Sequence, residues 1–322
     1  MKQSDNSSHF TVHARRIWIA VFTAVVGLIL AGCAANGVPS GVSATVNGIQ
    51  ITDAEIEGLT NGSEDEVSAD GEEYRNLLTN SIVTTAMVST AQEQFGLEDL
   101  STKEASDAFL SQASQQDIEL IGRVASNPEL TEHAVDLVIV QLNVRETVKR
   151  QLASETEFLQ DVWQNDQNLL MQACARHILV VTEEEANVAK DRFEAGEDFS
   201  ALASELSLDT QSPGGALPCP SRPDDFLQPF SSVVATAPVG IVAGPVETQF
   251  GWHIVLVDSR EFPQSLDELA ADPLRWLPPS IIDSTWIGWI NEALEVSDIV
   301  VRSQIGTWYP PVDGIIPPAP SP

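Results

Sequence analysis

The chain has 322 residues, with 16 Lys and Arg against 47 Asp and Glu, and a formal net charge of −31. An acidic excess of this size repels nucleic acid and anionic lipid head groups, so no nucleic-acid partner is expected. The length allows two modest domains.

The N-terminal residues have the pattern of an export signal. Three basic residues precede an uncharged apolar run of fourteen residues, Ile17 to Leu30. The run is as long as the apolar core of a signal peptide and short for a membrane span. Two adjacent arginines raise the twin-arginine export route, but the residues that flank them fit it poorly.

The apolar run ends in Leu-Ala-Gly-Cys, which resembles the lipobox of bacterial lipoproteins. The resemblance implies cleavage before Cys33, thioether lipidation of its sulfur, and a protein anchored on the extracytoplasmic face of the cell membrane. Two or three acyl chains would hold it stably, because one chain alone binds marginally. We expect residues 1–32 to be the signal peptide and residues 33–41 a tether. An uncleaved anchor helix with an incidental cysteine is the alternative.

Removal of residues 1–32 leaves 13 basic and 46 acidic residues, a net charge of −33. Nine acidic residues and no Lys or Arg lie between Asp53 and Glu73. This run lacks the ligand spacing of a calcium loop, so a solvated surface is favoured and neither a metal nor a cofactor is expected. Outside the cytoplasm the other two cysteines, Cys174 and Cys219, form an even pair, which favours a disulfide over two free thiols.

Residues 42–172 are expected to be mostly helical. Residues 42–56 predict two strands joined by an Asn47-Gly48 turn, then a helix capped by Thr52 or Asp53. Ser101 and Glu104 have capping-box spacing. Apolar periodicity predicts further helices over residues 74–95, 101–110, 131–152 and 155–172.

The pattern changes at Cys174, where apolar and polar residues begin to alternate as in a strand. A helix follows, capped by Thr182 and Glu185, then a second helix, a Gly- and Pro-rich loop, a short helix and a strand that opens at His253. A lone histidine on an apolar strand is most often a structural, hydrogen-bonded residue. The interpretation of His253 therefore depends on its neighbours.

Beyond Phe262 the chain returns to helix and then to a strand. Residues 280–295 place Ile282, Trp286 and Trp289 on one helical face, and residues 298–310 read as a strand. Residues 310–322 hold six prolines and predict an extended tail.

Several spaced motifs between residues 176 and 261 resemble a parvulin-type peptidyl-prolyl isomerase. They are "RHILV" (176–180), "DFSALASELSLD" (198–209), "GGALPC" (214–219), "FLQPF" (226–230) and "GPVETQFGWHIVLV" (244–257). With the lipobox and the helices on both sides, the chain is similar to PrsA/SurA-type extracytoplasmic foldases.

The resemblance implies an α+β fold. A parvulin domain, a small antiparallel sheet with surrounding helices at residues 173–262, would be inserted in a mostly helical chaperone domain. Residues 42–172 would form the first part of that chaperone domain and residues 263–309 the second. A short two-stranded pairing of the two parts would close it, and a Pro-rich tail would follow at residues 310–322.

The resemblance also assigns site residues. His177 and His253 match the family's paired histidines, with Asp209 beside them at a position held by Cys or Asp. Thr248 matches a hydroxyl residue five positions before the second histidine. Leu217, Phe226 and Phe230 match the residues that receive the proline ring. For Thr248 and the apolar residues, ordinary turn or core chemistry is the alternative.

The chemistry explains these residue types. An X-Pro bond isomerises over tens of seconds across a barrier of about 18–20 kcal/mol. Catalysis requires no nucleophile, but it requires an apolar pocket for the ring and groups that favour the twisted amide over the planar one.

The sequence departs from the family pattern near the site. The loop from Asp209 to Gly214 is about two residues shorter than usual, Ala216 replaces an acidic residue, and Pro218 replaces a glycine. These changes predict a reshaped pocket floor and a reduced rate of catalysis. A Cys174–Cys219 disulfide would tie the first strand to the "GGALP" turn that borders the site.

Residues 183–185 are three glutamates where phosphate-directed parvulins carry basic residues, so no preference for phosphopeptides is expected.

Two functions follow from this comparison. The first is a membrane-anchored isomerase that assists the folding of secreted proteins, with unfolded or partly folded chains that contain X-Pro bonds as its partners. The second is a holdase chaperone whose isomerase domain turns over weakly. A solute-binding lipoprotein shares only the lipobox and would need two α/β lobes. The sequence leaves the clients and the oligomeric state open.

Overall fold

The computed structural model describes residues 38–61, 71–98, 100–309 and 314–317. The expected signal peptide, Cys33 and most of the tether lie outside these residues, as does most of the Pro-rich tail. Within the described ranges, no helix combines the length and apolar character needed to cross a membrane.

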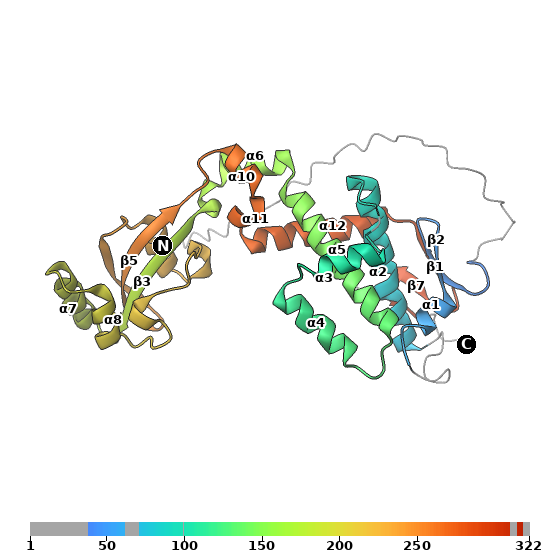
Figure 1. Cartoon of the computed structure of the whole chain (residues 1–322), viewed down its shortest axis with the longest axis horizontal. Helices are drawn as coiled ribbons and strands as arrows, with labels where there is room; N and C mark the ends of the chain where they lie inside the picture. Colours follow the sequence, from blue (N-terminus) through green and yellow to red (C-terminus); the bar gives the residue numbers. More distant parts are fainter. Residues whose placement is uncertain (1–37, 62–70, 99, 310–313, 318–322) are drawn as a thin grey trace, which may run out of the picture. The chain divides into compact units, whose positions relative to one another are not determined.

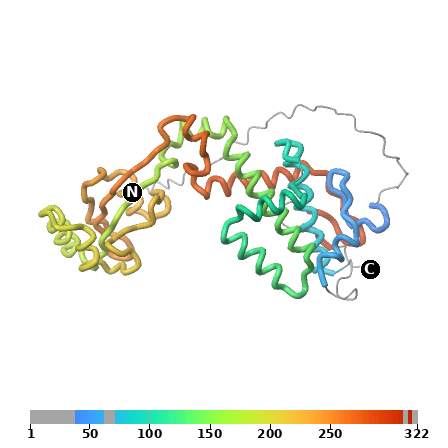
Figure 2. Tube along the Cα trace, viewed as in Figure 1, coloured from blue at the N-terminus to red at the C-terminus, as the bar shows by residue number. Residues whose placement is uncertain are grey.

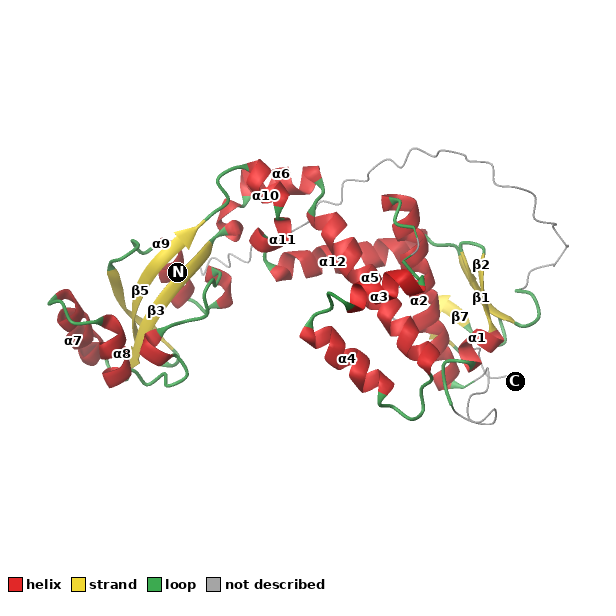
Figure 3. Ribbon diagram, in the orientation of Figure 1, coloured by secondary structure: helices red, strands yellow, loops and turns green. Residues whose placement is uncertain are grey.

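The fold is α+β, with small antiparallel sheets and helices that cover them (Figures 1 and 3). The strands are β1 (Val42–Val46), β2 (Ile49–Thr52), β3 (Gln172–Val180), β4 (Val242–Thr248), β5 (Gly251–Glu261), β6 (Ile299–Val301), β7 (Thr307–Tyr309) and β8 (Gly314–Ile316). The α-helices are α1 (Asp53–Glu57), α2 (Glu72–Phe95), α3 (Lys103–Leu110), α4 (Gln115–Ala125), α5 (Glu132–Ala153), α6 (Thr156–Asn165), α7 (Glu183–Glu194), α8 (Phe199–Leu206), α9 (Phe230–Thr236), α10 (Leu266–Ala271), α11 (Pro273–Trp276) and α12 (Pro279–Val296). Short 3₁₀ turns are η1 (Gln167–Leu170), η2 (Pro213–Gly215) and η3 (Pro223–Asp225).

Helices α2, α5 and α12 contact one another and form a core from segments far apart in the sequence. On α12, Trp286 and Trp289 stack with their ring centroids 5.3 Å apart and are buried against α2 and α5. Figure 2 shows the C-terminal segment running beside the N-terminal strands and helices. The apolar periodicity seen in the sequence thus corresponds to one shared core.

The first hairpin turns at Asn47 and Gly48, whose φ angles of 50° and 81° are the left-handed values that this tight turn requires. Thr52 caps α1 in a complete capping box with Glu55. Strand β6 pairs with β1 across about 250 residues of sequence. The expected closing pairing therefore forms, within a three-stranded sheet ordered β2-β1-β6.

Several local expectations differ from the structure. The helix expected over 155–172 ends at Asn165, and η1 leads into β3, because Leu170 turns inward to a buried cluster. Helix α3 is capped by Thr102, whose Oγ1 accepts from the amide of Ala105, so the Ser101–Glu104 capping box was wrong by one residue. Strand β8 forms within the region expected to be an extended tail.

Residues 172–261, here called the central domain, form a sheet ordered β3-β5-β4. One sheet face packs on α7 and α8 through apolar side chains such as Ile178 and Ile254. The opposite face packs on α9 through Val255, Phe230 and Val234. Strand β4 was not expected, because its Gly-Pro step interrupts the apolar alternation.

Candidate active site

The two histidines of the strand motifs, His177 and His253, lie on the α9 face of the central sheet. His177 pairs with Val255 in the β3–β5 register, and Leu179 pairs with His253, so the two imidazoles are diagonal neighbours on one face. Both side chains are buried, their Nδ1 atoms lie 3.1 Å apart, and the rings stack with centroids 5.3 Å apart.

Asp209 lies at one end of the histidine pair and contacts His177. Its Oδ2 lies 2.9 Å from Nε2 of His177 and accepts a 2.7 Å hydrogen bond from the Ser212 hydroxyl. Its Oδ1 accepts from the backbone N–H of Gln211, as Asp side chains do in Asx turns. The Ser212 hydrogen bond, followed by that of His177, lowers the pKa of Asp209 below its ordinary value. Asp209 is therefore an anion at neutral pH.

Thr248 lies at the other end of the histidine pair and contacts His253. It ends β4 at the turn into β5, and its Oγ1 lies 2.8 Å from Nε2 of His253. The same oxygen accepts from the backbone N–H of Phe250 at 3.1 Å. Gly251 has a φ of 131° and lies against the Val180 backbone carbonyl, so a side chain at this turn would collide with β3.

These contacts fix the direction of each hydrogen bond when both imidazoles are neutral. Ionised Asp209 can only accept, so Nε2 of His177 carries a proton and its Nδ1 is an acceptor. Nδ1 of His253 then donates to His177, which leaves Nε2 of His253 to accept from the Thr248 hydroxyl. The result is a continuous series of hydrogen bonds that runs from Thr248 through His253 and His177 to Asp209.

His253 stays neutral because of its surroundings. Its pKa is lowered from 6.5 to about 4, chiefly by burial; the nearby His177 acts in the same direction, and Asp209 opposes the shift. The assignment of hydrogen-bond directions is therefore consistent with the electrostatics of the site.

An apolar cluster borders the histidines. Phe230 meets His253 and His177 edge-on with centroid distances of 5.1 and 5.7 Å, and Phe226 lies 5.3 Å from Phe230. Leu217 packs on the same cluster. The structure thus brings all seven residues named by the resemblance to one face of the sheet, while their roles remain predictions.

The loop that carries Leu217 is held against β3. Gly215 has a φ of 78°, and a Cβ there would collide with the carbonyl of His177, so only glycine fits. Cys174 and Cys219 are joined in a disulfide with Cα atoms 4.8 Å apart, the pairing that the sequence favours over free thiols.

Two contributors to the site were not identified from the sequence. Ser212 holds Asp209, and the Ser207 hydroxyl accepts from the amides of Leu179 and Asp209. The Asp-x-x-Ser spacing is the one signal that could have indicated Ser212. Across the described part of the chain, no group of three or more His, Cys, Asp or Glu side chains is arranged to hold a metal ion.

Comparison with known proteins agrees with this geometry. Residues 177–259 match the Rotamase family, described as a PPIC-type PPIASE domain. The chain is 33% identical to the foldase protein PrsA of Clostridium botulinum (strain Okra / Type B1) over 142 residues, which is 42% of each chain. The match thus spans about two fifths of the length of that relative.

Two further similarities extend over more of the chain. The foldase protein PrsA of Halalkalibacterium halodurans is 27% identical over 238 residues, 71% of this chain and 68% of that one. A crystal structure of PrsA from Streptococcus pneumoniae covers 80% of this chain and 93% of that chain at 18% identity, with a TM-score of 0.48. The chain therefore contains a parvulin-type rotamase domain and is similar to PrsA foldases.

Proposed function

We propose that the protein is a peptidyl-prolyl cis/trans isomerase that assists the folding of exported polypeptides. One observation carries the proposal: the buried hydrogen-bond chain from Thr248 to Asp209 lies against the cluster of Leu217, Phe226 and Phe230. This combination provides an apolar surface for a proline ring beside ordered polar groups.

The site lowers the barrier to rotation about the X-Pro bond by changing the surroundings of the amide. As an X-Pro amide twists, the nitrogen lone pair localises and the carbonyl oxygen loses negative charge. An apolar surface around Phe230 withholds the water that stabilises the planar form, which lowers the cost of twisting. Because the hydrogen bonds of His177 and His253 are already satisfied within the protein, the groups need no reorganisation during the reaction.

The substrate is an unphosphorylated chain. Glu183, Glu184 and Glu185 form the first turn of α7 directly after β3. Glu185 is used in the capping box with Thr182, and the other two carboxylates are exposed. Carboxylates at this position repel a phosphate group.

The protein acts at the outer face of the cell membrane, held by lipid on Cys33. The lipobox-like residues 30–33 support this part of the proposal. Fractionation of cells that express the protein or its Cys33→Ser variant tests it. Equal recovery of both forms with the membranes would rule out the lipid anchor.

A proline-peptide exchange assay tests the isomerase. We expect the full chain in a neutral detergent to accelerate exchange above the uncatalysed rate. The variant His253→Gln breaks the series of hydrogen bonds. Its acceleration of exchange should be at least tenfold smaller than that of the unaltered protein. Absence of acceleration by the unaltered protein would refute the proposal.

The holdase is the second candidate. It is favoured by Leu227 and Phe250, which are next to the site and 62% and 64% exposed, so they can hold an apolar client segment without turnover. Suppression of client aggregation without acceleration of proline exchange would identify this function.

A further inference from the structure

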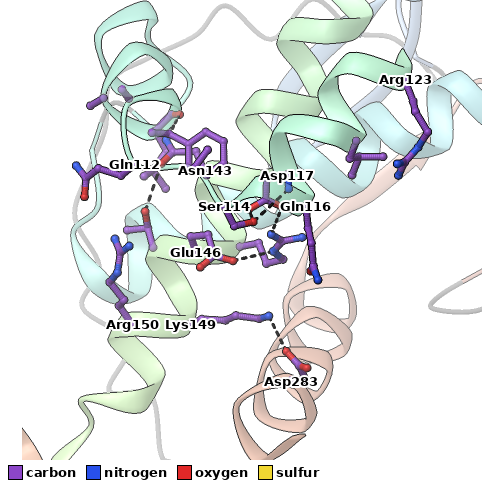
Figure 4. Close-up of a pocket in the computed structure, with 18 residues that line it drawn as sticks. Gln112, Ser114, Gln116, Asp117, Arg123, Asn143, Glu146, Lys149, Arg150 and Asp283 are labelled. Atoms are coloured by element: carbon purple, nitrogen blue, oxygen red, sulfur yellow. Dashed lines mark hydrogen bonds and ion pairs between the residues drawn. The ribbon is translucent and has the colours of Figure 1, made fainter. Parts of the chain in front are cut away.

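A cavity of about 840 Å³ lies outside the central domain, among α3, α4, α5 and the start of α12 (Figure 4). Its volume is within the range of ligand-binding pockets in proteins. Leu100, Phe109 and Leu120 contribute apolar surface, while Gln112, Gln116 and Asn143 contribute amides. The cavity does not contain any residue of the candidate active site.

The cavity concentrates positive charge in an acidic protein. Four of the 16 Lys and Arg of the chain line it, together with three carboxylates. The net charge of the side chains that line the cavity is thus +1, whereas that of the whole chain is −31. At physiological ionic strength charges act over roughly 8 Å, so a bound segment is influenced mainly by this local set.

Two of the cations already neutralise the carboxylates. Arg145 lies 2.6 Å from the buried Asp117 and 3.0 Å from Glu146. Lys149 lies 2.6 Å from Asp283 on α12, which ties α5 to that helix. These ion pairs fix the walls of the cavity and leave little of their charge for a ligand.

The other two cations are available. Arg123 and Arg150 are exposed, and neither guanidinium forms a side-chain hydrogen bond or ion pair with any described residue. Figure 4 shows them well apart, with Glu146 and Asp117 drawn between them. A single small anion cannot reach two cations placed in this way, whereas carboxylates spaced along a chain can.

The dimensions fit a short extended segment. The cavity lining on α5 runs from Asn143 to Arg150, a rise of about 10 Å at 1.5 Å per residue. An extended peptide covers that length in about three residues.

We propose that this cavity binds acidic peptide segments that contain a bulky apolar residue. Carboxylates of the segment pair with Arg123 and Arg150, and the apolar side chain lies on Leu100, Phe109 and Leu120. This proposal rests on one part of the proposed function, namely that the protein encounters exported polypeptides. It does not require that the central domain catalyses isomerisation.

Fluorescence anisotropy with a labelled ten-residue peptide tests the site. The peptide carries four Glu and two Leu, and it is titrated with the full chain in a neutral detergent. We expect saturable binding that weakens at least tenfold when every Glu is replaced by Gln, and that also weakens when both Leu are replaced by Ser. Equal binding of the Glu and Gln peptides would overturn the proposal, as would no binding.

Protein variants provide the second arm. Arg123→Gln with Arg150→Gln should weaken binding at least tenfold, because both charge-assisted contacts are lost. Lys103→Gln removes an exposed cation of α3 that lies outside the cavity lining, and it should change affinity less than twofold. Equal losses in both variants would indicate a general charge effect and refute the site. The His253→Gln variant should bind the peptide normally, so failure of this proposal and of the isomerase are distinguishable.

Discussion

At the scale of single residues, the site depends on a histidine that stays uncharged. His253 is buried between His177, Phe230 and Thr248, and its pKa of about 4 reflects chiefly the cost of charging a buried ring. In the unfolded chain its pKa returns to about 6.5. The difference links the stability of the central domain to pH.

We expect acidification from pH 6.5 to pH 4 to lower the free energy of unfolding. In this window the unfolded state binds a proton at His253 that the folded state does not, so stability rises with pH and falls on acidification. The shift corresponds to roughly 3 kcal/mol. Urea unfolding at several pH values, monitored by circular dichroism, measures it.

The variant His253→Gln is the control for this prediction. Every other ionisable group of the chain remains in the variant, so the difference in slope between the two proteins isolates His253. The same pH dependence in both proteins would show that His253 is charged in the folded state or does not contribute.

Single residues were predictable from the sequence to the extent that they belong to a spaced motif. His177 and His253 could be paired because the motifs that contain them, at residues 176–180 and 244–257, resemble the two histidine motifs of parvulins. Ser212 could not be identified, because a serine in a loop is common and its role depends on the orientation of Asp209. The directions of the hydrogen bonds likewise require the three-dimensional contacts.

At the scale of elements, the segment from Ala216 to Ser221 acts as an added edge to β3. Ala173 and Ser221 exchange two backbone hydrogen bonds of 2.8 Å, and the amide of Leu217 donates to the carbonyl of Ala175. The Cys174–Cys219 disulfide lies within this pairing. It therefore holds the segment that positions Leu217 beside the histidines.

We expect the double variant Cys174→Ser with Cys219→Ser to lower the free energy of unfolding of the central domain by about 3–4 kcal/mol. The bridge spans 45 residues of sequence, and opening such a loop restores entropy to the unfolded chain. Urea unfolding with and without a reductant measures the change. Because the variant lacks the bridge, reductant should destabilise only the unaltered protein. An equal response of both proteins would contradict the prediction.

Elements with strong periodicity were predicted well, and those set by tertiary contacts were not. Helices α2, α5 and α12 follow apolar spacing over 18 or more residues. Strand β4 has a Gly-Pro step at residues 244–245 and is recognisable as a strand only through its pairing with β5. The early end of α6 depends on the burial of Leu170 in a cluster with Leu269 and Trp276.

At the scale of the whole molecule, residues near both ends of the described chain meet in one buried polar network. Arg302, just beyond β6, lies 2.7 Å from the Asp53 carboxylate and also donates to the carbonyl of Val42. Tyr74 on α2 donates to Asp53 and contacts Ser43, which is fully buried. Burial raises the pKa of Tyr74 to about 12, so it remains a neutral donor.

The network makes the helical core depend on the C-terminal segment. Burial acts to raise the pKa of Asp53, but the hydrogen bonds from Arg302 and Ser43 outweigh it, and the net shift is downward. Arg302 therefore stabilises a partly buried anion contributed from about 250 residues earlier in the chain. Loss of one partner leaves the other charge without compensation.

We accordingly expect Arg302→Met to lower the free energy of unfolding by about 2 kcal/mol, since both members of the pair retain some solvent contact. The double variant with Asp53→Asn should recover part of this loss, because the uncompensated charge is then removed. Urea unfolding followed by tryptophan fluorescence reports on the core that contains Trp286 and Trp289. The exposed pair of Lys103 and Asp107 provides the control, and Lys103→Met should change stability by less than about 0.5 kcal/mol. Equal effects of the Arg302 and Lys103 variants would show that the contact between the two chain segments does not hold the helical core together.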